Sequence, residues 1–193
     1  MEMQVKFSGG ACIFAALLCL VLPLDWVAAA VLAASIHELC HILAVYAAGG
    51  AIQCLTIDIT GARMDAAPML PWKELLCILA GPAGSLGLVF VSSALPKAGI
   101  CGVFQGLFNL LPLEPLDGGR ALSCGSEMLF SPAVAHRICL TAKWITLVMI
   151  LLAGLWGYFV MNLGYLPLIG SLLLISRSSG GKFPCNAAKL AVQ

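Results

Sequence analysis

Apolar residues fill most of the chain in six long runs, which polar segments and segments rich in glycine or proline separate. A helix needs about 20 mainly apolar residues to cross the hydrocarbon core of a bilayer. The pattern therefore predicts about six transmembrane helices. Their approximate bounds are residues 11–24, 26–48, 73–95, 101–124, 138–161 and 164–177.

The segment between the second and third runs, "AIQCLTIDITGARMDAAPMLP", is too polar to span a membrane. Within it, "CLTIDIT" alternates and is rich in β-branched residues, which predicts a short strand, or a hairpin with Gly61 in its turn. Non-helical backbone lies at membrane depth only where protein buries it or a water-filled cavity faces it. An ordinary cytoplasmic loop is the alternative. The predicted fold class is an all-α polytopic membrane protein with a short membrane-associated strand or hairpin after the second helix.

Composition agrees with this class. The chain has 193 residues, of which 61% are hydrophobic and 10% charged, whereas soluble domains contain about 25% charged residues. Membrane segments use nearly all of the length, so we expect a single domain over residues 1–177 and a short cytoplasmic tail over 178–193. A net charge of +1 without a basic patch gives no support to nucleic-acid binding.

The basic residues predict an orientation. If the amino terminus is cytoplasmic, nine of the ten lysines and arginines, Lys143 among them, fall on or near the cytoplasmic side and only Lys97 lies outside. Both termini are then cytoplasmic. This assumes that the first run is a retained helix; a cleaved secretory signal is the alternative.

The second run contains the polar motif "HELCH", residues 37–41. On a helix, His37 and His41 lie on one face a turn apart and can aim ring nitrogens at one point. Glu38 lies about 100° around the axis, where it can reach a metal's water without being a ligand. This is the arrangement of a zinc hydrolase helix. Chance predicts roughly 0.001 such motifs in a chain of this composition, so we favour a metal site over two buried polar residues.

Catalytic zinc normally takes three protein ligands, so a third must be sought. Asp117 lies in "FNLLPLEPLDGGRAL", inside the fourth run, where Pro112 and Pro115 interrupt helical hydrogen bonding and two glycines follow. A carboxylate in such a broken helix is suited to meet a second helix across a cavity. A helix cap in a cytoplasmic turn is the alternative.

Together the two motifs resemble those of the site-2 proteases, the intramembrane zinc metalloproteases. That family has HExxH on one transmembrane helix and N-x-x-P-x-x-x-L-D-G on another, which Asn109 to Gly118 match. The resemblance covers the second to fourth helices, residues 26–124, and implies a three-helix catalytic core. The compact chain looks most like the sporulation-type branch, which cleaves a membrane-associated transcription-factor precursor.

The resemblance implies roles for individual residues. His37, His41 and Asp117 bind one zinc ion per chain, Glu38 is the general base and acid, and Asn109 stabilises the oxyanion or positions substrate. Two departures from the family stand out: Cys40 replaces a frequent glycine, and Ser85 stands where the family's G-P-x-x-N motif has asparagine. For "GPAGSLG", residues 81–87, close packing of small residues is the favoured interpretation.

We expect the client to be a membrane-associated protein with a segment in the bilayer, and a membrane regulatory protein is a further expected partner. A client segment that unwinds could pair as a strand with the "CLTIDIT" edge, with Ile57, Ile59 and Pro112 as substrate contacts. The resemblance implies the bacterial cytoplasmic membrane. An ion transporter and a catalytically inactive relative that only binds clients are the alternatives.

Overall fold

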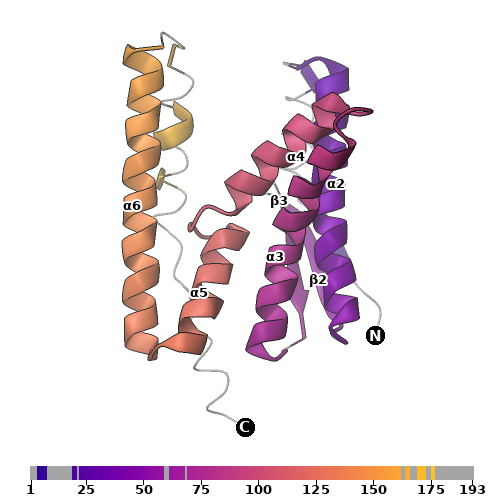
Figure 1. The fold of residues 1–193 in the computed structure, drawn as a ribbon, viewed down its shortest axis with the longest axis vertical. Helices are drawn as coiled ribbons and strands as arrows, with labels where there is room; N and C mark the ends of the chain where they lie inside the picture. Colours follow the sequence, from indigo (N-terminus) through magenta and orange to yellow (C-terminus); the bar gives the residue numbers. More distant parts are fainter. Residues whose placement is uncertain are drawn as a thin grey trace. The chain divides into compact units, whose positions relative to one another are not determined.

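The computed structural model describes residues 4–7, 19–20, 22–58, 61–67, 69–161, 164–165, 169–172 and 175–176. The predicted helix over 11–24, apart from its last residues, and the tail over 178–193 lie outside the described residues. The elements are β1 (Gln4–Phe7), α2 (Leu24–Ala47), β2 (Ile52–Asp58), β3 (Gly61–Ala66), α3 (Pro71–Gly87), the 3-10 helix η1 (Leu88–Val91), α4 (Pro96–Asn109), α5 (Asp117–Leu129) and α6 (Pro132–Phe159) (Figure 1). They fall into two compact units, Met1–Asn109 and Leu110–Gln193.

Three helical segments of the described chain are long and apolar enough to cross a membrane. They are Leu24–Ala47, Pro71–Val91 and Pro132–Phe159, and only 17%, 33% and 28% of their most apolar windows are buried. Most of their apolar surface is therefore open to the surroundings, as expected where lipid is the solvent. The chain is an integral membrane protein. Of the six predicted spans, the second, third and fifth are confirmed, and of the sixth only residues 169–172 and 175–176 are described as helical.

The fourth predicted span, residues 101–124, is not one continuous helix, and the break lies at the two prolines where the sequence predicted it. The structure has α4 up to Asn109, an irregular segment over 110–116, and α5 from Asp117. Pro112 and Pro115 have no backbone N–H and clash with a preceding helical turn. The chain is apolar throughout this run, but its backbone cannot remain helical across both prolines.

Helix α2 is bounded by local signals. It follows Pro23, and Asp25 lies in its first turn, where a negative charge favours the positive end of the helix dipole. At its other end Gly49 has a φ of 79°, a left-handed conformation that glycine adopts readily. The Gly49 N–H donates to the Tyr46 carbonyl and the Gly50 N–H to the Val45 carbonyl. This pair of bonds is a Schellman motif and ends the helix.

In the first unit, α2, α3 and α4 pack against one another pairwise. The buried positions of α4 are small: Ala98, Gly99, Gly102 and Gly106. A Cβ at Gly102 would lie 2.5 Å from the Ser85 carbonyl oxygen of α3. Small residues at this spacing let two helix backbones approach closely. The close approach brings the end of α4, and with it Asn109, to the polar face of α2.

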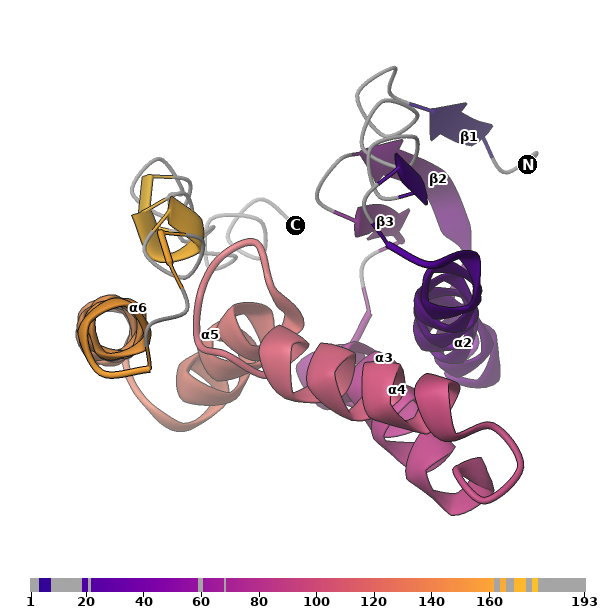
Figure 2. The ribbon, with the colours of Figure 1, turned by 90° about the horizontal axis from the view of Figure 1, so that it is seen from above.

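A three-stranded sheet, in the order β1-β2-β3, lies to one side of these helices (Figure 2). Strands β2 and β3 form the predicted hairpin, and Gly61, which was predicted in its turn, is the first residue of β3 and pairs with Asp58. Strand β1 was not predicted and pairs in parallel with β2. Residues 54–57 of "CLTIDIT" therefore form no free edge, because β2 is bonded there to β1 on one side and β3 on the other. The described fold is mainly α-helical with a small sheet beside the helices, in agreement with the predicted class.

In the second unit, α5 packs against α6. Helix α6 begins at Pro132, so Lys143 lies about 17 Å along its axis, and the side chain is buried at 6% exposure. The prediction counted Lys143 among residues on or near the cytoplasmic side, and the structure places it within the long apolar helix α6. Lys143 interacts electrostatically with Glu114. Burial raises the pKa of the Glu114 carboxyl above its ordinary value, and the positive charge of Lys143 opposes that rise.

Candidate metal centre

One face of α2 carries both histidines. Its inward positions repeat every four residues and are Ala29, Ala33, His37, His41 and Val45. His37 is buried at 2% exposure and His41 is half-buried. One turn beyond His41, Val45 joins a small apolar core with Ile52 and Cys77. This core fixes the start of α3 against the end of α2 and so sets the rotation of the histidine face.

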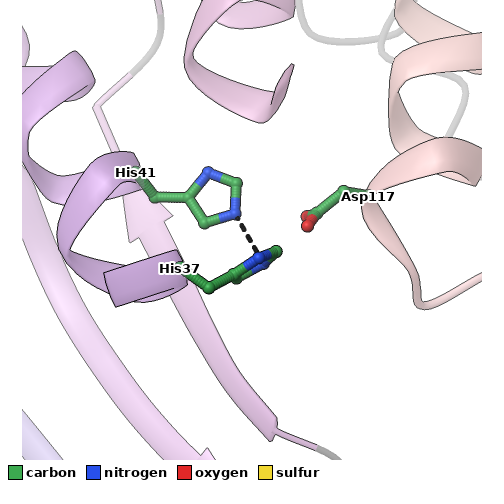
Figure 3. Close-up of side chains that lie close together, drawn as sticks. All are labelled: His37, His41 and Asp117. Carbon is green, nitrogen blue, oxygen red and sulfur yellow. Dashed lines mark hydrogen bonds between the residues drawn. The ribbon is translucent and has the colours of Figure 1, made fainter. Parts of the chain in front are cut away.

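The two imidazoles converge on one point. Their Nε2 atoms are 3.2 Å apart, and the rings meet edge to face with centroids 4.8 Å apart (Figure 3). The prediction that positions 37 and 41 aim ring nitrogens at one point is confirmed in this geometry.

The hydrogen bond of His41 Nδ1, the ring nitrogen that points away from His37, fixes the tautomer of His41. His41 Nδ1 lies 2.8 Å from the Cys77 carbonyl oxygen of α3. A carbonyl oxygen can only accept, so Nδ1 carries the proton and donates it. In the neutral ring Nε2 of His41 then carries the lone pair, and this atom faces His37.

The same argument applies to His37 through two side chains. The Asn109 amide nitrogen of α4 lies 3.3 Å from His37 Nε2, and an amide NH₂ can only donate. His37 Nε2 therefore accepts, and Nδ1 carries the ring proton. Nδ1 lies 2.9 Å from the Ser85 hydroxyl oxygen of α3, which accepts this proton.

This donor set fits zinc. Two nitrogen ligands about 2.0–2.1 Å from a tetrahedral metal are about 3.3 Å apart, close to the 3.2 Å between the two Nε2 atoms. Each Nδ1 is held by an oxygen atom, the outer-shell arrangement of metal-binding histidines. Without a metal the two Nε2 atoms lie within hydrogen-bond distance of each other, and a cation between them would take a lone pair from each.

Small residues of α3 make the close approach to α2 possible. A Cβ at Gly81 would lie 2.6 Å from His41 Cδ2 and closer still to His41 Nε2. At Gly84 a Cβ would overlap the Cys40 side chain, so Cys40 packs as a small residue against α3. The interpretation of "GPAGSLG" as a close-packing segment is confirmed, and the same segment also supplies Ser85.

The remaining predicted site residues lie as follows. Glu38 is half-buried on α2, one position after His37. Asp117 is the first residue of α5 in the second unit; a Cβ at Gly119 would lie 2.6 Å from the Leu113 carbonyl oxygen, so the helix start packs on its own preceding segment. Ile57 belongs to β2, the central strand, and Pro112 to the segment before α5. Ile59 lies outside the described residues.

The sequence did not identify Ser85 or the Cys77 carbonyl as partners of the histidines. A signal was present: Cys77, Gly81 and Ser85 recur every four residues on α3, and all three are buried. Which helix that stripe faces depends on tertiary packing and cannot be read from one segment.

No family model matches the chain. A protein of Synechocystis named "Putative zinc metalloprotease sll0528" is 34% identical over 102 residues, which are 45% of this chain and 27% of that protein. The Mycobacterium tuberculosis protein "Putative zinc metalloprotease Rip3" is 33% identical over 103 residues, 44% of this chain and 26% of that protein. The chain thus spans about a quarter of the length of these curated relatives.

A solved structure, that of the site-2 protease from Methanocaldococcus jannaschii, is similar along almost the whole chain. The TM-score is 0.63, the identity 20%, and the match covers 94% of this chain and 93% of that one. At this identity the likeness establishes the fold.

Proposed function

We infer that this chain, a member of the site-2 protease family, is a zinc endopeptidase that hydrolyses a peptide bond in or near the membrane segment of a client protein. The observation that carries the proposal is the pair of Nε2 atoms 3.2 Å apart on an apolar helix. Both relatives named as zinc metalloproteases and the shared fold support it. Ionisable groups inside a membrane are costly and usually functional.

Asp117 is proposed as the third ligand, for one zinc ion per chain. Catalytic zinc takes three protein ligands and keeps one position open. Asp117 has the right chemistry to join His37 and His41 in such a group. Its place at the first residue of α5, directly after the segment broken by two prolines, supports this role.

The side chains divide the remaining work. Zinc, when bound, supplies Lewis acidity and lowers the pKa of water toward about 7. Glu38, one residue from His37, takes the proton of the attacking water and passes it to the departing amine. Asn109 donates its amide N–H to the developing oxyanion; its present contact with His37 Nε2 supports this role because the amide already reaches the ligand face.

The client and its surroundings complete the proposal. We expect a membrane-associated client whose cleavage releases a transcription or signalling factor, as in the sporulation-type branch, with Ile57, Ile59 and Pro112 as substrate contacts and a membrane protein as regulator. The bacterial cytoplasmic membrane, both termini on the cytoplasmic side, and one catalytic domain over residues 1–177 are parts of the same proposal.

The first test is the zinc content of wild type and of Asp117→Ala, purified in detergent and measured by elemental analysis after loosely held metal is removed. We expect about one zinc per wild-type chain. The variant should bind zinc at least about 100-fold more weakly, because loss of an outer-shell partner alone costs roughly 10–100-fold.

Asp25→Ala is the matched control. Asp25 forms an exposed ion pair with Lys97 at the start of α2, and such pairs are worth about 0–1 kcal/mol, so this variant should retain zinc. A folded wild type without zinc would overturn the proposed function. Equal zinc in wild type and Asp117→Ala would overturn only the third ligand.

A further inference from the structure

Ser85 is a buried polar side chain that the proposed reaction does not use. It is 0% exposed, and α4 closes over it at Gly102. A hydroxyl in such a place costs free energy unless it is hydrogen-bonded. Its partner is His37 Nδ1, 2.9 Å away and on a different helix.

The direction of this hydrogen bond decides whether His37 can bind a metal. If the hydroxyl accepts, Nδ1 carries the proton and Nε2 offers its lone pair. If the hydroxyl donated instead, the neutral ring would carry its proton on Nε2 and could not coordinate a metal. The Asn109 amide, which can only donate to Nε2, selects the first arrangement.

We propose that Ser85 is a positioning residue that accepts a hydrogen bond from His37 Nδ1–H and thereby keeps His37 Nε2 unprotonated and directed at the metal position. The inference rests on the proposed function. It assigns Ser85 on α3 the part that the Cys77 carbonyl plays for His41. Each histidine on α2 then has one oxygen on α3 that holds its outer nitrogen.

Replacing Ser85 by alanine should weaken zinc binding without disturbing the helix packing. Alanine is small enough for the site, but Nδ1–H of His37 loses the hydroxyl that accepts its hydrogen bond. The ring can then adopt the other tautomer despite the Asn109 amide, because its Nε2–H can donate to His41 Nε2 across the 3.2 Å separation. This internal hydrogen bond competes directly with the metal. We expect a loss in zinc affinity of roughly 10–100-fold.

The experiment measures zinc affinity of the full chain in detergent by competition with a chromophoric chelator. Ser126→Ala is the matched control, because Ser126 is also buried and its hydroxyl donates to the Ser123 carbonyl on α5, in the second unit. We expect Ser126→Ala to bind zinc as wild type does. Thermal unfolding of both variants without metal measures any purely structural effect.

A second readout follows the tautomer itself. Nitrogen-15 NMR of histidine-labelled, metal-free protein should place the His37 proton on Nδ1 in wild type and on Nε2 in Ser85→Ala. Wild-type zinc affinity and an unchanged tautomer in Ser85→Ala would overturn the inference and leave the proposed function intact. Lack of zinc binding by the wild type would instead overturn the proposed function.

Discussion

Glu38→Gln should bind zinc as tightly as wild type and cleave client segments about 10²–10⁴-fold more slowly. A general base contributes a factor of this size, and glutamine keeps the shape of the side chain while it cannot accept the proton of water. Glu38 lies on α2 beside His37 without belonging to the ligand pair. The measurement is cleavage of tagged single-span segments in proteoliposomes, read by mass spectrometry, together with zinc per chain.

Glu127→Gln is the control for this change of charge. The Glu127 carboxylate accepts a hydrogen bond from Ser123 within α5, so its loss should leave both zinc and turnover unchanged. Cleavage by Glu38→Gln near the wild-type rate would end the assignment of Glu38 as the base. Loss of both zinc and turnover in Glu38→Gln would show that Glu38 is needed for zinc binding.

The parts of the structure that the sequence predicted depend on local patterns. The repeat of four between His37 and His41 specifies a shared helix face whatever packs against it. The alternation in "CLTIDIT" likewise predicts the β2–β3 hairpin. In both cases the information lies within a few residues of one segment.

The missed parts depend on segments far apart in the chain. Strand β1 has four residues and becomes a strand by pairing with β2, about 50 residues later. Ser85 and Asn109 reach His37 from α3 and α4 only because small residues set the distance and rotation of those helices. A single segment does not encode these contacts.

Two helix starts were missed although the sequence marks them. Apolarity placed the starts near residues 101 and 138, but α4 begins at Pro96 and α6 at Pro132. Proline is favoured in the first turn of a helix, where its missing N–H has no partner to lose. Because the predicted start of α6 was six residues too late, Lys143 was counted near the end of that helix.

Gly81→Ala should strongly weaken zinc binding, although Gly81 itself is not a proposed ligand. The added Cβ would lie 2.5 Å from His41 Cε1 and closer to Nε2, so the ring must rotate or α3 must move away from α2. Either change breaks the bond from His41 Nδ1 to the Cys77 carbonyl. We expect at least about 100-fold weaker zinc binding, as for a lost ligand, and a cost of about 1–3 kcal/mol in the free energy of unfolding, typical of overpacking.

Gly87→Ala tests whether the effect is specific, because Gly87 ends the same helix and a Cβ there meets nothing within 4 Å. This variant should keep its zinc and be as stable as wild type or slightly more so.

Combining Gly81→Ala with His41→Ala separates a general folding defect from the clash with the His41 ring. If the clash with the ring is the cause, Gly81→Ala should destabilise the wild-type chain but not the chain that already carries His41→Ala, which gives a coupling energy in a double-mutant cycle. Additive effects, or zinc binding by Gly81→Ala equal to that of Gly87→Ala, would show that α3 does not hold the His41 ring in place.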